Sequence, residues 1–193
     1  MSALEMTGGA EAGPVDCGTL QRELLRAATD GRLELLPPDA EPEGGRLIAE
    51  LQVRDTQGYA AARVAIAQAA ELAGMPPEGT TDLLLATGEA ISNAMKYGGG
   101  AECLVFLREG RVVVRVRDRG PGIPTLDLPA AVLLPGFSTA ISLGLGYEMM
   151  LKLVDCVRLR TGPDGTLVQL EKWVGEPEAP PREPDYSLAT AAA

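Results

Sequence analysis

Two polar side chains, four residues apart on a predicted helix, are the first candidates for chemistry in this sequence. Glu89 and Asn93 lie in the stretch EAISNAMKYGGG, and Lys96 follows three residues further along. Residues four apart lie on one face of a helix, one turn from each other. A carboxylate, a carboxamide and an ammonium group beside a glycine-rich helix end could form a polar site. They could equally form a solvated face with a hydrogen bond between Glu89 and Asn93, and this stretch alone leaves both alternatives open.

A second candidate is Asp118, at the end of a predicted strand and followed by Gly120 and Gly122. The two glycines permit close approach of the backbone. A buried aspartate in this position could accept a hydrogen bond from an exocyclic amine such as that of adenine. The alternative is a surface turn, because Asp, Gly and Pro all favour turns.

A third candidate is the glycine-rich start of a predicted helix near residue 146. The N-terminus of a helix exposes backbone N–H groups and favours anions, phosphate in particular. Two glycines at the start of a helix are common, so this pattern is a weak signal by itself. The residues concerned are Ser142, Leu143, Gly144, Leu145 and Gly146.

The elements that must position these residues follow from the spacing of the apolar residues. Alternation predicts strands at residues 46–53, 103–108, 111–118, 156–161 and 166–173, and helical spacing predicts helices at 57–73, 81–97 and 147–154. Turn residues at 109–110 and 162–165 indicate hairpins, whose strands are antiparallel. We therefore predict a two-layer α/β sandwich, with a mixed, mainly antiparallel sheet and helices on one face.

Two finer expectations concern the helices. Helical spacing places Val64 and Leu72 on the buried side of the helix at residues 57–73. Thr80 or Thr81 is expected to cap the start of the next helix, and the glycines from Gly98 onward are expected to end it.

Composition divides the chain into three parts. Residues 1–45 are rich in small and acidic residues, glycine and proline, which predicts a poorly ordered N-terminal extension with a short helix at 20–28. Residues 46–174 carry the periodic patterns and are predicted to form the one domain. Residues 175–193 are rich in Glu, Pro and Ala, which predicts a disordered tail.

Overall composition excludes several classes of protein. The net charge of −10 over 193 residues argues against a protein that binds nucleic acid. No apolar run approaches the roughly 20 residues needed to span a membrane, and no secretory signal is visible, so we expect a cytoplasmic protein. Cys17, Cys103 and Cys156 are far apart and odd in number, as expected of reduced thiols. The absence of histidine excludes Ser-His-Asp hydrolases and histidine-ligated metal enzymes.

Taken together and in this order, the three stretches resemble the motifs of the GHKL ATPase superfamily. Residues 89–98 look like its N box, residues 118–122 like its G1 box, and residues 144–146 like its G2 box, while Gly165 and Thr166 stand at its late threonine position. The resemblance covers residues 46–174 and implies the Bergerat, or histidine-kinase-like ATPase, fold. Residues 136–147, 153–155, 165–166 and 172–173 are similar to the bacterial anti-sigma-factor and switch serine kinases.

The resemblance implies ATP and Mg²⁺ as ligands. Asn93 would hold the magnesium ion, and Glu89 would be the general base that takes the proton from a protein serine. Asp118 would bind the adenine amine together with Thr166, and Lys96 would reach a phosphate. Further nucleotide contacts are implied at Tyr97, Gly120, Gly122, Ile123, Ser142, Leu143, Gly144, Leu145 and Gly146.

The same resemblance implies a serine/threonine protein kinase in a partner-switching pathway. Its protein partner would be a STAS-domain antagonist, with a sigma factor or a phosphatase as a further partner, and a homodimer is one expected state. One departure favours an alternative, a nucleotide-dependent binding module that transfers nothing: no Lys or Arg stands between Arg119 and Lys152. A second departure is modest, since Tyr97 stands where histidine is frequent in these kinases. A free-standing histidine-kinase ATPase domain fits less well, because the chain has no phosphoacceptor histidine.

Overall fold

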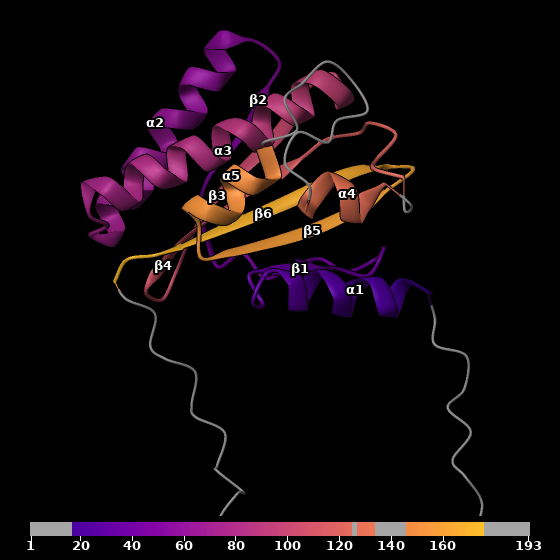
Figure 1. Cartoon of the computed structure of the whole chain (residues 1–193). Coiled ribbons are helices and arrows are strands. Elements are labelled where there is room, and N and C mark those ends of the chain that lie inside the picture. The colour runs from indigo at the N-terminus through magenta and orange to yellow at the C-terminus, as the bar shows by residue number, and fades with distance from the viewer. Residues whose placement is uncertain (1–16, 125–126, 134–145, 176–193) are drawn as a thin grey trace, which may run out of the picture.

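One six-stranded sheet organises the chain (Figure 1). The structure, a computed structural model, describes residues 17–124, 127–133 and 146–175. The strand order is β1-β5-β6-β4-β3-β2, and every neighbouring pair is antiparallel except β1 with β5. The strands are β1 Leu33–Leu35, β2 Arg46–Val53, β3 Ala101–Arg108, β4 Arg111–Arg117, β5 Cys156–Gly162 and β6 Gly165–Trp173. The predicted mixed, mainly antiparallel sheet is therefore confirmed.

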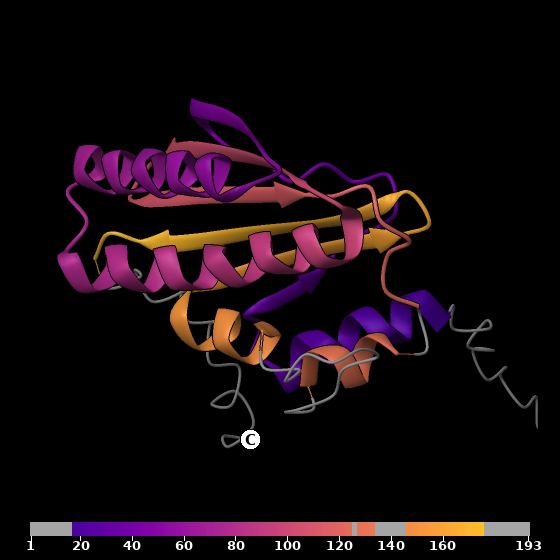
Figure 2. The same cartoon turned by 90° about the horizontal axis from the view of Figure 1, so that it is seen from above.

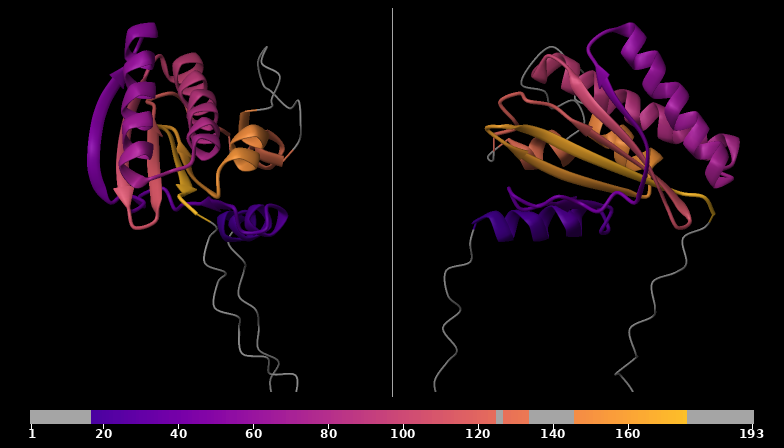
Figure 3. Two further views of the ribbon diagram at one scale, coloured as in Figure 1. Left: turned by 90° about the vertical axis from the view of Figure 1, so that its left-hand side faces the viewer. Right: turned by 180° about the vertical axis from the view of Figure 1, so that it is seen from behind.

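The helices form a second layer against one face of the sheet, which is seen edge-on in the left panel of Figure 3. Helices α2 (Thr56–Ala73) and α3 (Pro77–Gly98) pack on β2, β3, β4 and β6, and α5 (Gly146–Leu153) packs on α3 and β5. Helices α1 (Cys17–Ala28) and α4 (Leu128–Leu133) contact each other beyond α5, and α1 also packs on β1. The predicted two-layer α/β sandwich is confirmed.

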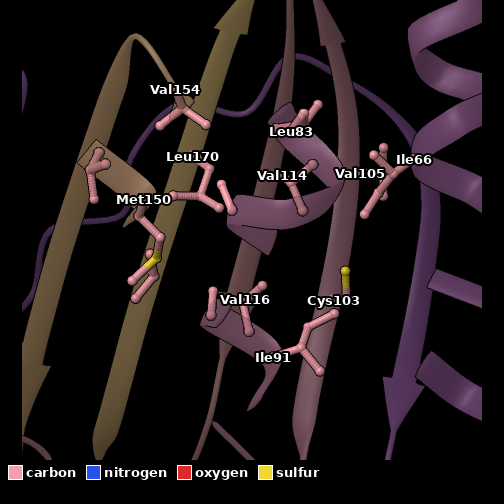
Figure 4. Close-up of a cluster of buried hydrophobic side chains, with 14 of the residues drawn as sticks. Ile66, Leu83, Ile91, Cys103, Val105, Val114, Val116, Met150, Val154 and Leu170 are labelled. Atoms are coloured by element: carbon pink, nitrogen blue, oxygen red, sulfur yellow. The ribbon is translucent and has the colours of Figure 1, made fainter. Parts of the chain in front are cut away.

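The core lies between the two layers (Figure 4). Successive residues of a strand point to opposite faces, so β3 and β4 send alternate residues inward. These inward side chains meet apolar residues of α2, α3 and α5 over the middle of the sheet. The labelled members of this cluster are Ile66, Leu83, Ile91, Cys103, Val105, Val114, Val116, Met150, Val154 and Leu170.

Helix α3, which carries the first candidate residues, begins earlier than predicted. Pro77 is its first residue and Pro76 its N-cap, so the predicted cap at Thr80 or Thr81 is wrong. Proline suits the first helical position because that residue needs no N–H donor there. The two threonine hydroxyls donate instead to the carbonyls of Pro76 and Pro77. The predicted glycine end is confirmed, with Gly99 in the left-handed region at φ 70°.

The buried side of α2 also differs from the prediction. Val64 and Leu72 are 57% and 66% exposed, whereas the inward residues are Ala62, Ala65, Ile66, Ala69 and Ala70. Helix α2 carries alanine on all sides, so the spacing of its apolar residues does not show which side is buried. The side that packs on the sheet combines four alanines with Ile66, and the small alanines let the helix lie close to the strands.

Residues 17–45 are part of the fold rather than a poorly ordered extension. β1 pairs with β5 through Leu33, Glu34 and Leu35, and Leu25 of α1 and Leu33 are fully buried. The predicted short helix is confirmed and extends over Cys17–Ala28. A three-residue strand gives almost no periodic signal, which is why the sequence placed the start of the sheet at Arg46.

The face of the sheet away from the helices, seen in the right panel of Figure 3, carries an ionic network instead of an apolar surface. The fully buried Glu171 pairs with Arg158 and, at 2.8 Å, with Arg111, and it accepts a hydrogen bond from Gln169 at 2.9 Å. Glu41, in the segment between β1 and β2, pairs with arginines of β4 and β5 at 2.8 to 3.4 Å: Arg115, Arg117 and Arg160. The segment before β2 is thereby fixed across this face.

The two cysteines whose side chains are described, Cys103 and Cys156, are free thiols, as predicted. Burial raises the pKa of Cys103 to about 12, so this thiol is protonated and unreactive at neutral pH.

Among the described residues, no helix combines the length and apolarity that crossing a membrane requires.

We expect Leu33→Ala to lower the free energy of unfolding by about 2 to 5 kcal/mol, because it leaves a cavity at a fully buried position. Leu20→Ala is the control in the same segment, since Leu20 is 56% exposed, and its effect should stay within about 0.5 kcal/mol. Urea unfolding followed by circular dichroism measures both. Equal, small effects would show that residues 17–35 do not belong to the cooperative folding unit.

Candidate functional site

Glu89 and Asn93 project from α3 toward the first residue of α5. A Cβ atom placed on Gly146 would lie 3.3 Å from Oε2 of Glu89 and 3.2 Å from Nδ2 of Asn93. Such contacts are tighter than most side chains tolerate, so glycine lets the start of α5 lie directly against both polar groups. The first and third candidate stretches therefore meet in space, although 53 positions separate Asn93 from Gly146.

These two side chains are half-buried and lack partners. Among the described residues, none forms a hydrogen bond or an ion pair with the Glu89 carboxylate or the Asn93 carboxamide. The alternative of a hydrogen bond between Glu89 and Asn93 is therefore not what the structure shows. Their polar atoms are not among the fully buried, unpartnered atoms of the described residues, so they are open to water or to a ligand. Their arrangement is typical of a site that a ligand completes.

Asp118 follows β4 and is fixed by the neighbouring strand. Its Oδ1 accepts hydrogen bonds from the backbone N–H groups of Gly120, at 2.8 Å, and Thr166, at 3.1 Å. Its own N–H donates to the carbonyl of Thr166 at 2.9 Å. Within the described part of the chain, no group donates to the second carboxylate oxygen, Oδ2. Asp118 is thus a held, half-buried acceptor, and the alternative of a free surface turn is wrong.

Glycines close the backbone around Asp118. A Cβ on Gly98, at the end of α3, would lie 2.5 Å from the Cβ of Asp118, and a Cβ on Gly165 would lie 2.1 Å from the Asp118 carbonyl oxygen. Gly120 in turn packs against the carbonyl oxygen of Tyr97, 2.7 Å from its own Cβ position. The end of α3, the end of β4 and the β5–β6 hairpin therefore converge on one carboxylate. This convergence joins the second candidate stretch to the first.

Thr161 is a site residue that the sequence reasoning missed. Its hydroxyl accepts a hydrogen bond from the N–H of Ile123 at 2.7 Å and lies 3.2 Å from the hydroxyl of Thr166. Thr161 and Thr166 are cross-strand partners in the β5–β6 hairpin. Pairing the residues outward from the turn at 162–165 could have found Thr161 as the neighbour of Thr166. Gly122, at φ 73°, leads into this contact and packs against Gly162.

Tyr147 also borders the site. It follows Gly146 in the first turn of α5 and is partly buried against the core. Burial raises the pKa of the Tyr147 phenol, and the nearby Asp118 carboxylate raises it further. The phenol is therefore neutral at physiological pH and contributes a polar but uncharged wall near Asp118.

Lys96 and Tyr97 lie at the exposed end of α3. The Lys96 ammonium is 5.0 Å from the centre of the Tyr97 ring, and Tyr97 is 42% exposed. Both are on the same helix as Glu89 and Asn93, but Lys96 faces the aromatic ring in this structure. Of the third candidate stretch, only Gly146 can be placed, because Ser142, Leu143, Gly144 and Leu145 lie outside the described residues.

Lys172 ties the two helices of the site together. Its ammonium donates to the carbonyl of Leu153, in the last turn of α5, at 2.7 Å and pairs with Asp82 of α3 at 3.0 Å. A cation at the C-terminus of a helix compensates the negative end of the helix dipole. Lys172, on β6, thus fixes the helix that begins at Gly146 relative to the helix that carries Glu89.

A hollow of about 840 Å³ adjoins Asp118 from the far side of the sheet. Its lining includes Arg54, Arg117, Arg119 and Asp164. Glu89, Asn93 and Thr166 do not line it, so we assign the candidate site to the helix side of the sheet, where the unpaired polar groups lie.

Fold and site together indicate a ligand-binding α/β domain in which α3 presents Glu89 and Asn93 against the first residue of α5. The chain belongs to the histidine kinase-like ATPase family, whose domain model matches residues 53–172, more than half of the chain. The predicted GHKL superfamily and its fold are confirmed.

Relatives within this family include anti-sigma factors. The anti-sigma F factor of Bacillus cereus (strain G9842) is 32% identical over 136 residues, which is 64% of this chain and 90% of the relative. The anti-sigma F factor of Bacillus licheniformis is 29% identical with the same coverage. The chain is therefore related to the anti-sigma factors of this family.

Two solved structures are similar to part of this chain at low sequence identity. The RsbU and RsbW domains of a Mycobacterium tuberculosis protein match 67% of this chain and 33% of theirs, with 19% identity and a TM-score of 0.47. A chain of the SiaB–SiaC complex of Pseudomonas aeruginosa matches this chain with 13% identity and a TM-score of 0.46. The match covers 66% of this chain and 90% of that chain.

We expect Gly146→Ala to weaken ATP binding by about tenfold or more, because the added methyl group forces Glu89 and Asn93 apart from α5. The melting temperature should not fall, since alanine favours a helix more than glycine does. Gly162→Ala is the matched control, because a Cβ there meets no atom within 4 Å. Isothermal titration with ATP measures the affinities. Unchanged affinity in Gly146→Ala would contradict the proposed position of the ligand.

Asp118→Asn keeps the shape of the side chain and removes its charge. A hydrogen bond to a charged acceptor contributes about 1.5 to 3 kcal/mol, so we expect ATP affinity to fall roughly 10-fold to 150-fold. Asp164→Asn, the same substitution in the exposed β5–β6 turn, serves as the control. Competition with fluorescent ATP reads out both variants. If the two substitutions have equal effects, Asp118 does not contact the nucleotide.

Proposed function

We propose that this protein is an ATP-dependent serine/threonine protein kinase that acts as an anti-sigma or switch factor in a bacterial partner-switching pathway. The observation that carries the proposal is the half-buried pair of Glu89 and Asn93, which lies against Gly146 and has no side-chain partner in the described part of the chain. The family match and the anti-sigma F factor relatives at 29% to 32% identity support it.

The residues present fit ATP and Mg²⁺. Magnesium prefers oxygen ligands and shares them with the phosphates of a nucleotide. The Asn93 carboxamide oxygen has no hydrogen-bond partner among the described residues, so it is free to take that role. When bound, the ion supplies positive charge that neutralises the phosphates during transfer. Asp118 would accept the adenine amine through Oδ2, while Oδ1 stays engaged with Gly120 and Thr166.

Glu89 would act as the general base. Within the described ranges, no cation pairs with its carboxylate, and α3 fixes it one turn from Asn93. In the reaction, the substrate hydroxyl oxygen bonds to the terminal phosphorus of ATP as the bond to the leaving ADP oxygen breaks. The hydroxyl proton passes to Glu89. Phosphoryl transfer needs chiefly positioning and charge neutralisation. The protein therefore has to supply only one general base, held in place by a rigid helix.

A second candidate function is a nucleotide-dependent binding module without turnover. The observation that favours it is the lack of any Lys or Arg between Arg119 and Lys152, the stretch that covers the site in the family. In a kinase, positive charge near the terminal phosphate would then come from Lys96, from α5 amides or from the partner protein. A module that only captures its partner does not need that charge.

The partner in both cases would be a STAS-domain antagonist, with a sigma factor or a protein phosphatase as the regulated protein. The names of the anti-sigma F factor relatives support the sigma-factor branch. A cytoplasmic location and a homodimer remain part of this proposal.

We expect Glu89→Gln to bind ATP as tightly as the wild type and to lose about 10²- to 10⁴-fold in the rate of phosphoryl transfer, because general-base catalysis acts in the transition state. Asn93→Ala should lose the magnesium-dependent part of ATP affinity. Glu78→Gln, at an exposed position in the first turn of the same helix, is the control. Binding is measured with and without Mg²⁺, and transfer with radiolabelled ATP and a purified STAS-domain protein.

The three outcomes separate the two functions. Transfer that Glu89→Gln abolishes supports the kinase. Magnesium-dependent binding without transfer by the wild type supports the binding module. A folded wild type that binds no ATP refutes both.

A further inference from the structure

The C-terminal end of α5 is held by an arginine that lies outside the part of the chain that matches the family. Arg32 donates a hydrogen bond from Nη1 to the carbonyl of Leu151 at 2.7 Å, whereas the family model covers only residues 53–172. The last carbonyls of a helix have no partner within the helix and form the negative end of its dipole. A guanidinium at this point therefore fixes α5 as well as stabilising it.

Arg32 is itself rigidly placed by the turn between α1 and β1. The buried Thr29 hydroxyl donates to the carbonyl of Leu25 at 2.8 Å and accepts from the N–H of Leu33 at 3.0 Å. The carbonyl of Arg32 accepts from the N–H of Val157 on β5 at 2.8 Å. The backbone on both sides of Arg32 is thus tied down, and its side chain reaches α5 from a fixed base.

The same N-terminal segment touches a second part of the nucleotide cover. Helix α1 packs against α4, as Figure 2 shows, and α4 lies between the Asp118 stretch and Gly146 in the sequence. Leu128 and Val132 of α4 are buried in the same apolar core as Leu25 of α1. Residues 17–35 therefore contact both α4 and α5, the two described helices that follow Ile123 in the chain and contact each other.

We propose that residues 17–35 form an N-terminal clamp that sets the position of α4 and α5 over the nucleotide, with Arg32 as its positioning residue. The proposal rests on the proposed ATP site. Helix α5 has only eight residues, so a displacement at Leu151 is transmitted to Gly146, which lies against Glu89 and Asn93. Lys172 holds the same helix end from within the residues that match the family model, and Arg32 adds a second contact from outside them. The clamp slows the release of bound nucleotide.

The test compares Arg32→Gln with Arg26→Gln. Arg26 is exposed on α1, and among the described residues no side-chain partner of it is found, so it controls for the loss of one charge from the same segment. A cation at a helix C-terminus changes an equilibrium constant by a factor of about two to five. Arg32→Gln should therefore increase the dissociation rate of a fluorescent ATP analogue, measured with Mg²⁺, by about that factor. Arg32→Lys keeps the charge and should restore part of the effect. Stopped-flow fluorescence measures the rates in the full-length protein.

Hydrogen exchange of the α5 amides provides a readout that needs no nucleotide. We expect faster exchange in α5 for Arg32→Gln than for Arg26→Gln, with equal melting temperatures of the two variants. Equal α5 exchange and equal dissociation rates in both variants would refute the clamp. If the wild type binds no ATP analogue, the proposed function is refuted. The hydrogen exchange of α5 then shows by itself whether Arg32 holds this helix. A lowered melting temperature with unchanged α5 exchange would assign Arg32 a general structural role and also refute the clamp.

Discussion

The Asp118 carboxylate is the constraint on which the rest of the site depends. Glycines allow the close packing around it: Gly98 lies against the Asp118 side chain, Gly165 against the Asp118 carbonyl oxygen, and Gly120 against the end of α3 at Tyr97. The hydrogen bonds that Asp118 accepts from Gly120 and Thr166 fix where β4 ends relative to β6. The end of α3 is thereby fixed as well, and with it the orientation of the helix that presents Glu89 and Asn93. A single acceptor thus links the strand ends to the helix that carries the candidate polar pair.

The sheet and the helical layer contribute different groups to the candidate site. The sheet supplies fixed hydrogen-bonding groups, since Asp118, Thr161 and Thr166 all lie at strand ends that the ladder holds in register. The helices supply Glu89 and Asn93, the pair that we propose to meet phosphate and metal, and two cations, Lys172 and Arg32, hold the C-terminal end of α5.

Strong periodicity made most of the fold predictable from the sequence. The alternating valines of β4 and the hairpin turns fixed the strands, and the motif residues Glu89, Asn93, Asp118 and Gly146 were found from their spacing and neighbours. β1 was not predictable, because three residues carry no usable period and their pairing with β5 spans more than 120 positions. The buried face of α2 was misjudged because alanine marks no side of a helix. Thr161 was overlooked since its role depends on cross-strand pairing rather than on any local motif.

The two edges of the sheet have a consequence for assembly. β1 is only three residues long, and the pairing of β2 with β3 shifts register between Leu47 and Ala49. Short or bulged edge strands are poor templates for another strand, because their free N–H and C=O groups do not form a continuous row. The sheet is therefore protected against open-ended stacking with other chains and against adding a partner's strand. The partner protein that we propose would therefore meet the helical layer, which also carries Glu89 and Asn93.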